Sequence, residues 1–431
     1  MKRYLTGIDW VINSIDYIGK AQVGIGNVSQ VAIELKGQPE SKVLQEALNS
    51  FIRKFPLLNG LPSRALNLCP YWKIFPQKKM LPLRINTAYL DDNANSYSLL
   101  AAQVNKPFQN KREHLVFNLI RSGKRNFLGL TFDHRLLDAR GAEAFLDLFQ
   151  CYYQKEPLAP LALDEPPHLN HWAEKFRAGK QVNRFFLRLS KNTPHILSLD
   201  SGSCICKFKI ISFDVEEASH IVKVAYEQAG YLMLMPFILA KTIQVLHRVF
   251  EARKRPGLVY LIPVTIDTRQ QEKVHKELFF NYLSFFFFKI NAEVADNFTN
   301  LIADIKEQMY EQVKTELPAA LKNASFLLRI APLPLVNFFL RLMSKKHFAS
   351  FSFSFVGSAY NSPKFMEEEV QNIFHIPRVP NPPGLGIFFN QFNGRLNATI
   401  SYFDGILNDN EIGRIVSDLK VLGNEDQGNN L

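Results

Sequence analysis

Two apolar, strand-like runs, residues 386–392 and 395–403, flank the dipeptide Asn393-Gly394 near the end of this 431-residue chain. Asn-Gly between two such runs is the strongest short-range signal for a β-hairpin, because both residues tolerate the positive φ angles of a two-residue turn. The chain is therefore expected to contain a pair of antiparallel strands near its end, which any fold assigned to it must accommodate.

Further strands are predicted from alternating or β-rich composition, and helices from apolar residues at helical spacing. The strands are 28–35, 126–132, 207–213, 257–263 and 282–290, and the helices are 43–52, 139–153, 215–228, 235–250, 298–317 and 410–419. Strands do not alternate strictly with single helices, so a doubly wound parallel sheet is not expected. We predict an α/β fold of the α+β type, built from two lobes that are each a mixed sheet with flanking helices.

A run of turn-forming residues divides the chain. Four prolines between residues 157 and 167 mark a loop or linker, and residues 200–203 form a second polar break. A common domain size of about 150 residues also suggests more than one unit. We expect an N-terminal lobe over 1–165, a linker region over 166–203 and a C-terminal lobe over 204–431.

The formal net charge of +11 favours an anionic partner. The basic residues are dispersed and no nucleic-acid-binding motif is present, so nucleic acid is not expected. A phosphorylated cofactor, an acidic carrier protein or a membrane surface would suit the charge equally well. With 47% hydrophobic residues and 36 Phe, the composition is that of a globular protein rather than a disordered one.

No stretch supplies the roughly 20 uninterrupted apolar residues of a membrane span, and the N-terminus lacks a secretory apolar core. We therefore expect a cytoplasmic protein. Its four cysteines lack the spacing of a zinc knuckle, and His168 and His171 lack an acidic third ligand. Reduced thiols and no metal site are expected.

Two apolar segments admit more than one interpretation. Residues 326–348 mix Leu, Phe and Val with basic residues, which fits either a peripheral membrane contact or lid, or a helix pair packed on the second lobe and broken at Pro332 and Pro334. Residues 284–288 include four consecutive Phe, which could line an acyl tunnel but more often form core. For this second segment we favour the core interpretation.

The segment 131–138 is the strongest candidate for chemistry. In a strand alternate residues share a face, so His134 is the polar end of an apolar row that includes Leu130 and Phe132. A histidine at the edge of an apolar face, near an acid such as Asp138, is a common way to build a base that works near neutral pH. Two other interpretations stay open: a hydrogen-bonded core histidine, and Asp138 as an N-cap worth about 1 kcal/mol.

The sequence DHRLLDA at 133–139 resembles the HHxxxD(G) signature of the chloramphenicol acetyltransferase-like superfamily, nearest its condensation-domain, wax-ester synthase and polyketide-associated acyltransferase branches. Other stretches are similar to the family in matching order: 31–58 to its opening strand and helix, 262–269 to its PVdlR strand, and 401–405 to its SYdG element. The first histidine of the signature is Asp133 here, and the final glycine is Ala139. The DFGWG motif of the plant branch is absent.

The resemblance implies two lobes around a tunnel, with His134 midway along it as the general base. Asp138 would support the site through an ion pair with an arginine, for which Arg269 is the best match. Three further candidates to contact substrate or to stabilise an oxyanion are Asp133, Asn281 and Ser354. The resemblance implies no permanently bound cofactor, since acyl-CoA or a phosphopantetheinyl thioester is a co-substrate.

Three functions follow from this resemblance. The first is an acyltransferase that moves an acyl group from acyl-CoA or an acyl carrier protein to a hydroxyl or amine of a small or lipid-like molecule. The second is a stand-alone condensation protein that forms an amide, as in nonribosomal peptide synthesis. The third, suggested by Asp133 and Ala139, is a catalytically silent carrier-binding or scaffold protein, although the intact His134 argues against it.

Overall fold

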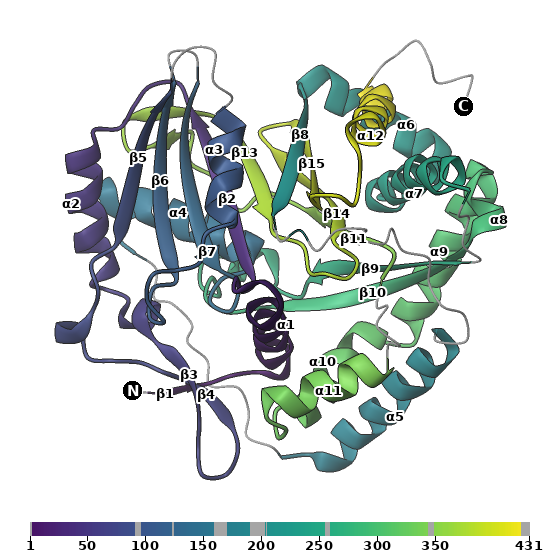
Figure 1. Ribbon diagram of the computed structural model, residues 1–431, viewed down its shortest axis with the longest axis horizontal. Coiled ribbons are helices and arrows are strands. Elements are labelled where there is room, and N and C mark those ends of the chain that lie inside the picture. Colours follow the sequence, from purple (N-terminus) through teal and green to yellow (C-terminus); the bar gives the residue numbers. More distant parts are fainter. Residues whose placement is uncertain are drawn as a thin grey trace.

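The computed structural model describes residues 2–90, 96–122, 125–158, 170–189, 203, 205–254, 259–343 and 349–423. Within these residues two six-stranded sheets carry most of the β structure, and a smaller three-stranded sheet accompanies them. The two large sheets lie side by side, and helices pack around them (Figure 1). The predicted fold of two mixed α/β lobes is confirmed.

The first sheet has the strand order β12-β13-β2-β7-β6-β5, and all neighbouring strands are antiparallel except β5 with β6. Its strands are β2 (Val28–Leu35), β5 (Arg84–Leu90), β6 (Leu115–Ser122), β7 (Asn126–Asp133), β12 (Lys364–Phe365) and β13 (Glu368–Pro377). Helices α2 (Ser41–Ile52) and α4 (Ala139–Tyr153) share one hydrophobic core with this sheet, and α3 (Ser96–Val104) shares another.

Every residue of β7 is buried, because helices cover both faces of this strand. Leu128, Leu130 and Phe132 pack in the core that α2 and α4 complete. Phe127 lies on the opposite face, in the core formed with α3. The predicted alternation is therefore present, although neither face of the strand meets solvent. The strand ends at Asp133 and places the next residue, His134, at the end of the first sheet.

The second sheet has the order β10-β9-β11-β14-β15-β8, in which β11 runs parallel to both neighbours and the other pairs are antiparallel. Its strands are β8 (Cys206–Phe213), β9 (Val259–Asp267), β10 (Leu283–Asn291), β11 (Ser352–Val356), β14 (Leu385–Phe392) and β15 (Arg395–Phe403). Its helices are α6 (Val215–Ala229), α7 (Leu234–Ala252), α8 (Ala292–Ala295), α9 (Phe298–Lys314) and α12 (Asp409–Lys420), whose apolar faces form one core with the sheet.

The hairpin predicted from Asn393-Gly394 joins β14 to β15. Phe392 pairs with Arg395 at its closed end. Asn393 has φ 45° and Gly394 has φ 75°, the left-handed conformations that a two-residue hairpin turn demands. The prediction is confirmed at this turn.

The expected division of the chain into lobes is wrong in one part, because β12 and β13 belong to the first sheet. β13 pairs with β2 from Val370 opposite Leu35 to Pro377 opposite Ser29. Residues 364–377 therefore leave the second lobe, which was expected to contain all of 204–431. An isolated apolar strand pattern does not specify which sheet edge it joins, so the sequence alone did not reveal this exchange.

The region expected to be a linker contains a long helix, α5 (Trp172–Leu189). It packs against α10 (Leu317–Leu328), and Phe185 and Phe186 contact Phe287 of β10. The linker prediction is therefore wrong for these residues, since an amphipathic helix with a docking partner occupies them. Most of the rest of 166–203, His168 included, lies outside the described residues.

Helix α1 (Gly7–Val23) packs against α10 and α11 (Leu333–Met343). Trp10 Nε1 donates to the carbonyl of Ala331 at 3.1 Å, and Ser14 Oγ donates to Asn337 Oδ1. Residues 326–343 thus form parts of two packed helices, the second beginning after Pro332, as one interpretation of this segment expected. The small sheet, in the order β1-β4-β3, consists of β1 (Lys2–Tyr4), β3 (Leu61–Arg64) and β4 (Pro70–Lys73).

The run of four Phe lies in β10. Phe286 and Phe288 are buried in the core of the second lobe. Phe285 and Phe287 are half-buried, and Phe287 contacts the aromatic rings of α5. The run therefore packs between two layers, which agrees with the core interpretation.

Among the described residues, no single helix is long and apolar enough to cross a membrane. Helices α6 and α7 taken together have the length and apolar composition of a membrane span, but the two are bent by 91° relative to each other.

Candidate active site

The loop that carries His134 is a tight connection between β7 and α4. The backbone N–H of His134 donates to the carbonyl of Asn27 at 2.9 Å, and that of Leu136 donates to the carbonyl of Asp133 at 2.9 Å. His134 itself is half-buried, whereas both of its sequence neighbours are buried. The loop therefore holds the histidine backbone in place and leaves part of the residue open to its surroundings.

The side chain of Asn281 forms two hydrogen bonds with His134. Its Nδ2 donates to the backbone carbonyl of His134 at 2.9 Å, and its Oδ1 lies 3.1 Å from the imidazole Nδ1. Because a carbonyl only accepts, the amide nitrogen must face it, so the amide oxygen must face the ring. Nδ1 then carries the proton and donates it to Oδ1. In the neutral ring, Nε2 is left with its lone pair available as a base.

Two further contacts hold Asn281 in position. Its backbone N–H donates to Asp9 Oδ1 of α1 at 3.1 Å. The preceding residue, Phe280, donates its N–H to the carbonyl of Leu136 at 2.6 Å. Asn281 is 5% exposed, so its amide is shielded from competing water. Segments from the N-terminus and from the second half of the chain therefore meet on the loop that carries His134.

Asn281 makes a contact that we did not expect. We expected it to contact substrate or an oxyanion, whereas its amide oxygen and one of the two N–H groups of Nδ2 contact His134. Asn281 therefore positions the histidine, and its contact with substrate or an oxyanion stays a prediction.

Asp138 caps α4 and joins the loop to the second half of the chain. Its Oδ1 accepts the N–H of Gly141 at 2.8 Å, as an N-cap does. Its Oδ2 accepts the N–H of Tyr282 at 3.1 Å and forms an ion pair with Arg269. The structure thus contains the expected Asp138–Arg269 pair together with the capping role that was its alternative.

Arg269 is enclosed by acceptors. Its side chain is 0% exposed, Nη1 donates to Asp267 Oδ2 at 3.1 Å, and Nε donates to the carbonyl of Glu277 at 2.9 Å. Burial opposes the charge, but the carboxylates of Asp138 and Asp267 outweigh it and raise the pKa of Arg269. The guanidinium is therefore permanently charged and rigidly held, which fixes the loop between β7 and α4.

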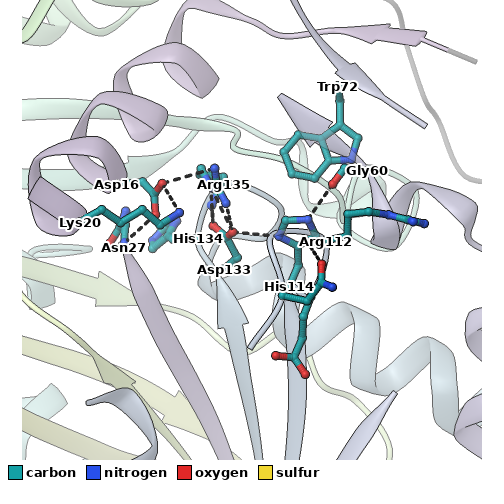
Figure 2. A network of polar contacts seen from close by, with 12 residues as sticks. Asp16, Lys20, Asn27, Gly60, Trp72, Arg112, His114, Asp133, His134 and Arg135 are labelled. Carbon is teal, nitrogen blue, oxygen red and sulfur yellow. Dashed lines mark hydrogen bonds and ion pairs between the residues drawn. The ribbon is translucent and has the colours of Figure 1, made fainter. Parts of the chain in front are cut away.

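Asp133 was also a candidate for substrate contact, and this expectation is wrong. Its carboxylate is 2% exposed and faces Arg135 and His114, with 2.9 Å between Asp133 Oδ2 and His114 Nδ1 (Figure 2). Burial alone would raise the pKa of Asp133, but the Arg135 guanidinium and the hydrogen bond to His114 outweigh it and hold the pKa well below its ordinary range. Because strand parity turns Asp133 away from His134, it enters this buried network instead of the site.

The same network reaches α1 through Asp16. Its Oδ2 lies 3.3 Å from Nη1 of Arg135 and 2.8 Å from Nζ of Lys20 (Figure 2). Its Oδ1 accepts the N–H of Asn27 at 3.0 Å, and the carbonyl of Asn27 in turn accepts the N–H of His134. A continuous set of polar contacts therefore runs from α1 to the backbone of the histidine.

Ser354 lies on β11 in the second sheet, where Thr265 donates a hydrogen bond to its hydroxyl at 2.8 Å. No hydrogen bond joins Ser354 to His134 among the described residues. The role expected for Ser354 stays a prediction.

Sequence reasoning missed several residues that position the loop. Asp9, Asp16, Asn27, His114 and Arg135 all contact it directly or through one partner. Of these, only Asp9 carried a local signal, because Thr6 and Asp9 have the spacing of a helix capping box. Asp16, Asn27 and His114 act over long sequence separations that no local pattern records, whereas Arg135 is the neighbour of His134 and pairs with Asp133, two residues before it.

The described residues form a fold with two large sheets, in which the loop after β7 carries His134. No protein-family model matches the sequence, and no curated protein matches it. Solved structures of condensation domains and of an acetyltransferase share the fold.

Three of these structures show the extent of the similarity. The first condensation domain of the CDA synthetase has a TM-score of 0.67 and 10% identity over 98% of this chain and 96% of that chain. The trichothecene 15-O-acetyltransferase of Fusarium sporotrichioides has a TM-score of 0.66 and 12% identity over 98% of this chain and 95% of that chain. The EpoB cyclization-docking bidomain of Sorangium cellulosum has a TM-score of 0.64 and 14% identity over 99% of this chain and 86% of that chain. At these identities the similarity establishes the fold alone, over nearly the whole chain.

Proposed function

We propose that this protein is an acyltransferase that moves an acyl group from a thioester donor to a hydroxyl or amine, with His134 as the general base. The observation that carries the proposal is the bond between Nδ1 of His134 and Oδ1 of Asn281, at 3.1 Å. This bond selects the tautomer in which Nε2 can accept a proton. A half-buried histidine held in this state suits catalysis better than a buried structural role.

The proposed reaction needs one base and no covalent enzyme intermediate. Nε2 of His134 removes the proton from the acceptor hydroxyl or amine while that atom attacks the thioester carbonyl carbon. The tetrahedral intermediate collapses, the carbon–sulfur bond breaks, and the imidazolium returns the proton to the leaving sulfur. Such proton transfer contributes about 10²- to 10⁴-fold to the rate. Throughout, Asn281 keeps the Nδ1 proton in place.

The donor is proposed to be acyl-CoA or an acyl group on a carrier protein. Both present the thioester on phosphopantetheine, and both are anionic, which suits a chain of net charge +11. The acceptor is proposed to be a small or lipid-like molecule. We also propose that donor and acceptor reach His134 through a tunnel between the two lobes.

Thiol release tests the proposal directly. A panel of acyl-CoA donors is offered with simple alcohol and amine acceptors, and free thiol is followed for the wild type, His134→Ala and His134→Gln. We expect release that falls at least about 100-fold in both variants. His220→Ala on α6 replaces a histidine remote in sequence from the loop and serves as the matched control. Equal activity in the wild type and in His134→Ala would remove His134 as the base.

A second candidate is amide formation on carrier-bound substrates. It is favoured by the similarity to solved condensation domains. In the test, the protein is given an acyl-phosphopantetheinyl carrier protein as donor and an amine as acceptor, and the amide product is followed by mass spectrometry. Product with the carrier-bound donor but not with CoA would support this candidate. A folded protein inactive with both donors would instead favour a carrier-binding scaffold.

A further inference from the structure

Three side chains with metal-binding atoms converge on the outer part of the second lobe. His247 and Glu251 lie one turn apart on α7, and Asp296 follows α8 immediately. One nitrogen and two carboxylate oxygens from these residues lie within 4.8 Å of one another. In Figure 1 this region, where α7 approaches α8, is far from the end of β7 that bears His134.

The distances within this cluster fit shared coordination better than hydrogen bonding. Nε2 of His247 lies 3.5 Å from Glu251 Oε1 and 3.5 Å from Asp296 Oδ2. Hydrogen bonds from nitrogen to oxygen span about 2.7–3.2 Å, so both contacts are long. Two ligands bound at about 2.0–2.1 Å in a tetrahedral zinc site are separated by about 3.3–3.4 Å. The spacing observed is therefore close to that of ligands around one cation.

His247 is buried, and a hydrogen bond to Tyr260 orients its ring. It is 3% exposed, and its Nδ1 forms a hydrogen bond with the hydroxyl of Tyr260, which is 1% exposed. When the phenol oxygen accepts the Nδ1 proton, Nε2 points its lone pair between two carboxylates, and a bound cation makes that arrangement favourable.

The carboxylates are accessible, and the backbone that carries one of them is tied to α7. The side chains of Glu251 and Asp296 are 49% and 68% exposed, so a hydrated ion reaches them from solvent. Gln244 on α7 donates to the carbonyl of Asp296 at 3.1 Å. A cation held here would join α7 to the turn between α8 and α9 on top of this existing bond.

We propose that His247, Glu251 and Asp296 form a binding site for a divalent cation of the zinc class, with water completing its coordination. One imidazole nitrogen and two carboxylate oxygens are ligands that Zn²⁺ accepts, and three protein ligands with an open fourth position is a recurrent zinc arrangement. The site is independent of His134 and stabilises the second lobe.

Zinc binding to the intact protein tests the proposal. Zn²⁺ is titrated against a chromophoric chelator in the presence of the metal-free protein, and the thermal midpoint is measured with and without Zn²⁺. We expect one Zn²⁺ per chain and a midpoint that rises with Zn²⁺ concentration. His247→Ala, Glu251→Gln and Asp296→Asn should each weaken binding at least about tenfold, comparable to the effect of losing a supporting metal-site contact.

The matched control is His220→Ala on α6. Glu216 lies four residues before His220, so the two form a helical His/Glu pair, and the part of the chain that the structure describes adds no third ligand to this pair. This variant should bind Zn²⁺ as the wild type does. Glu251→Gln and Asp296→Asn alter exposed side chains, so they keep the test decisive even if His247→Ala does not fold. A wild type without stoichiometric Zn²⁺ binding, or equal loss in the His220 variant, would overturn the proposal.

Discussion

The amide of Asn281 holds both the backbone and the ring of a single residue, His134, through a bond of 2.9 Å to its carbonyl and one of 3.1 Å to its Nδ1. The first bond fixes which way the amide faces, and the second then fixes the tautomer of the ring. The two residues are 147 positions apart in the chain. The state of the proposed base therefore depends on how the two halves of the chain dock.

Replacing Asn281 should alter the pH dependence of acyl transfer. In Asn281→Ala the ring loses its Nδ1 partner, and we expect kcat/KM to fall about 10- to 100-fold, as for other residues that orient a functional histidine. In Asn281→Asp a carboxylate beside the ring favours the imidazolium, so the acidic limb of the rate profile should move to higher pH. Profiles of kcat/KM against pH for both variants check this. An unmoved acidic limb in Asn281→Asp would contradict the assigned contact.

The ion pair between Asp138 and Arg269 should contribute strongly to stability. In Asp138→Asn, Oδ1 still caps α4, but Arg269 loses one of its two carboxylates while remaining buried. Breaking a buried pair costs about 3–5 kcal/mol, and the lower end applies because Asp267 remains. Urea unfolding of Asp138→Asn, Arg269→Met and the double variant measures this loss. If the losses of the single variants simply add in the double variant, the two residues are not coupled.

The sequence predicted the elements that depend on local chemistry. The hairpin at Asn393-Gly394 was predictable because its turn requires left-handed backbone at both positions. Helix α4 follows the same logic: Asp138 is an N-cap, and the apolar residues after it recur at helical spacing. His134 stood out because a polar residue ended an otherwise apolar strand face.

The sequence did not predict contacts made between distant segments. β13 joins β2 across more than 300 residues, and only the packing of the whole chain selects that edge. For the same reason Asn281 was assigned to substrate instead of to His134. Asp133 was misjudged for a second reason. Its partner His114 is 19 residues away, and its partner Arg135 is only two residues away but lies in the loop after β7, where strand periodicity no longer predicts which side chains meet.

The lowered pKa of Asp133 predicts its effect on acid stability. A carboxyl whose pKa is lower when folded adds stability above its unfolded pKa, about 3.9, and that stability is lost as pH falls toward the folded pKa. We therefore expect the free energy of unfolding to fall more steeply below about pH 4 in the wild type than in Asp133→Asn. Urea unfolding over this range measures both slopes. Parallel slopes would contradict the charged pair with Arg135.

Asp147 provides the opposite case on α4. Burial raises its pKa, so its charged form carries a cost above the folded pKa that disappears as the carboxyl is protonated. The two N–H groups of Asn361 and Ser362 both donate to the same oxygen, Oδ1, which an asparagine retains. We expect Asp147→Asn to be more favourable relative to the wild type at pH 7 than near pH 4, as measured by urea unfolding. A difference between the two proteins that does not change with pH would contradict this assignment.

Gly141 and Ala139 both lie in the first turn of α4, but exchange of glycine and alanine should be more costly at Gly141 than at Ala139. A Cβ on Gly141 would lie 2.2 Å from the carbonyl oxygen of Leu278, a backbone atom that cannot move aside without displacing the segment that leads to Asn281. We expect Gly141→Ala to lower the free energy of unfolding by about 1–3 kcal/mol. It should also lower activity, because displacement of this segment would disturb the hydrogen bonds between Asn281 and His134. Ala139 begins the helix without a positive φ, so Ala139→Gly should cost about 1 kcal/mol or less and restore no activity. Thermal unfolding and thiol release measured on both variants decide this, and a gain in rate in Ala139→Gly would show that the missing glycine of the signature limits the enzyme.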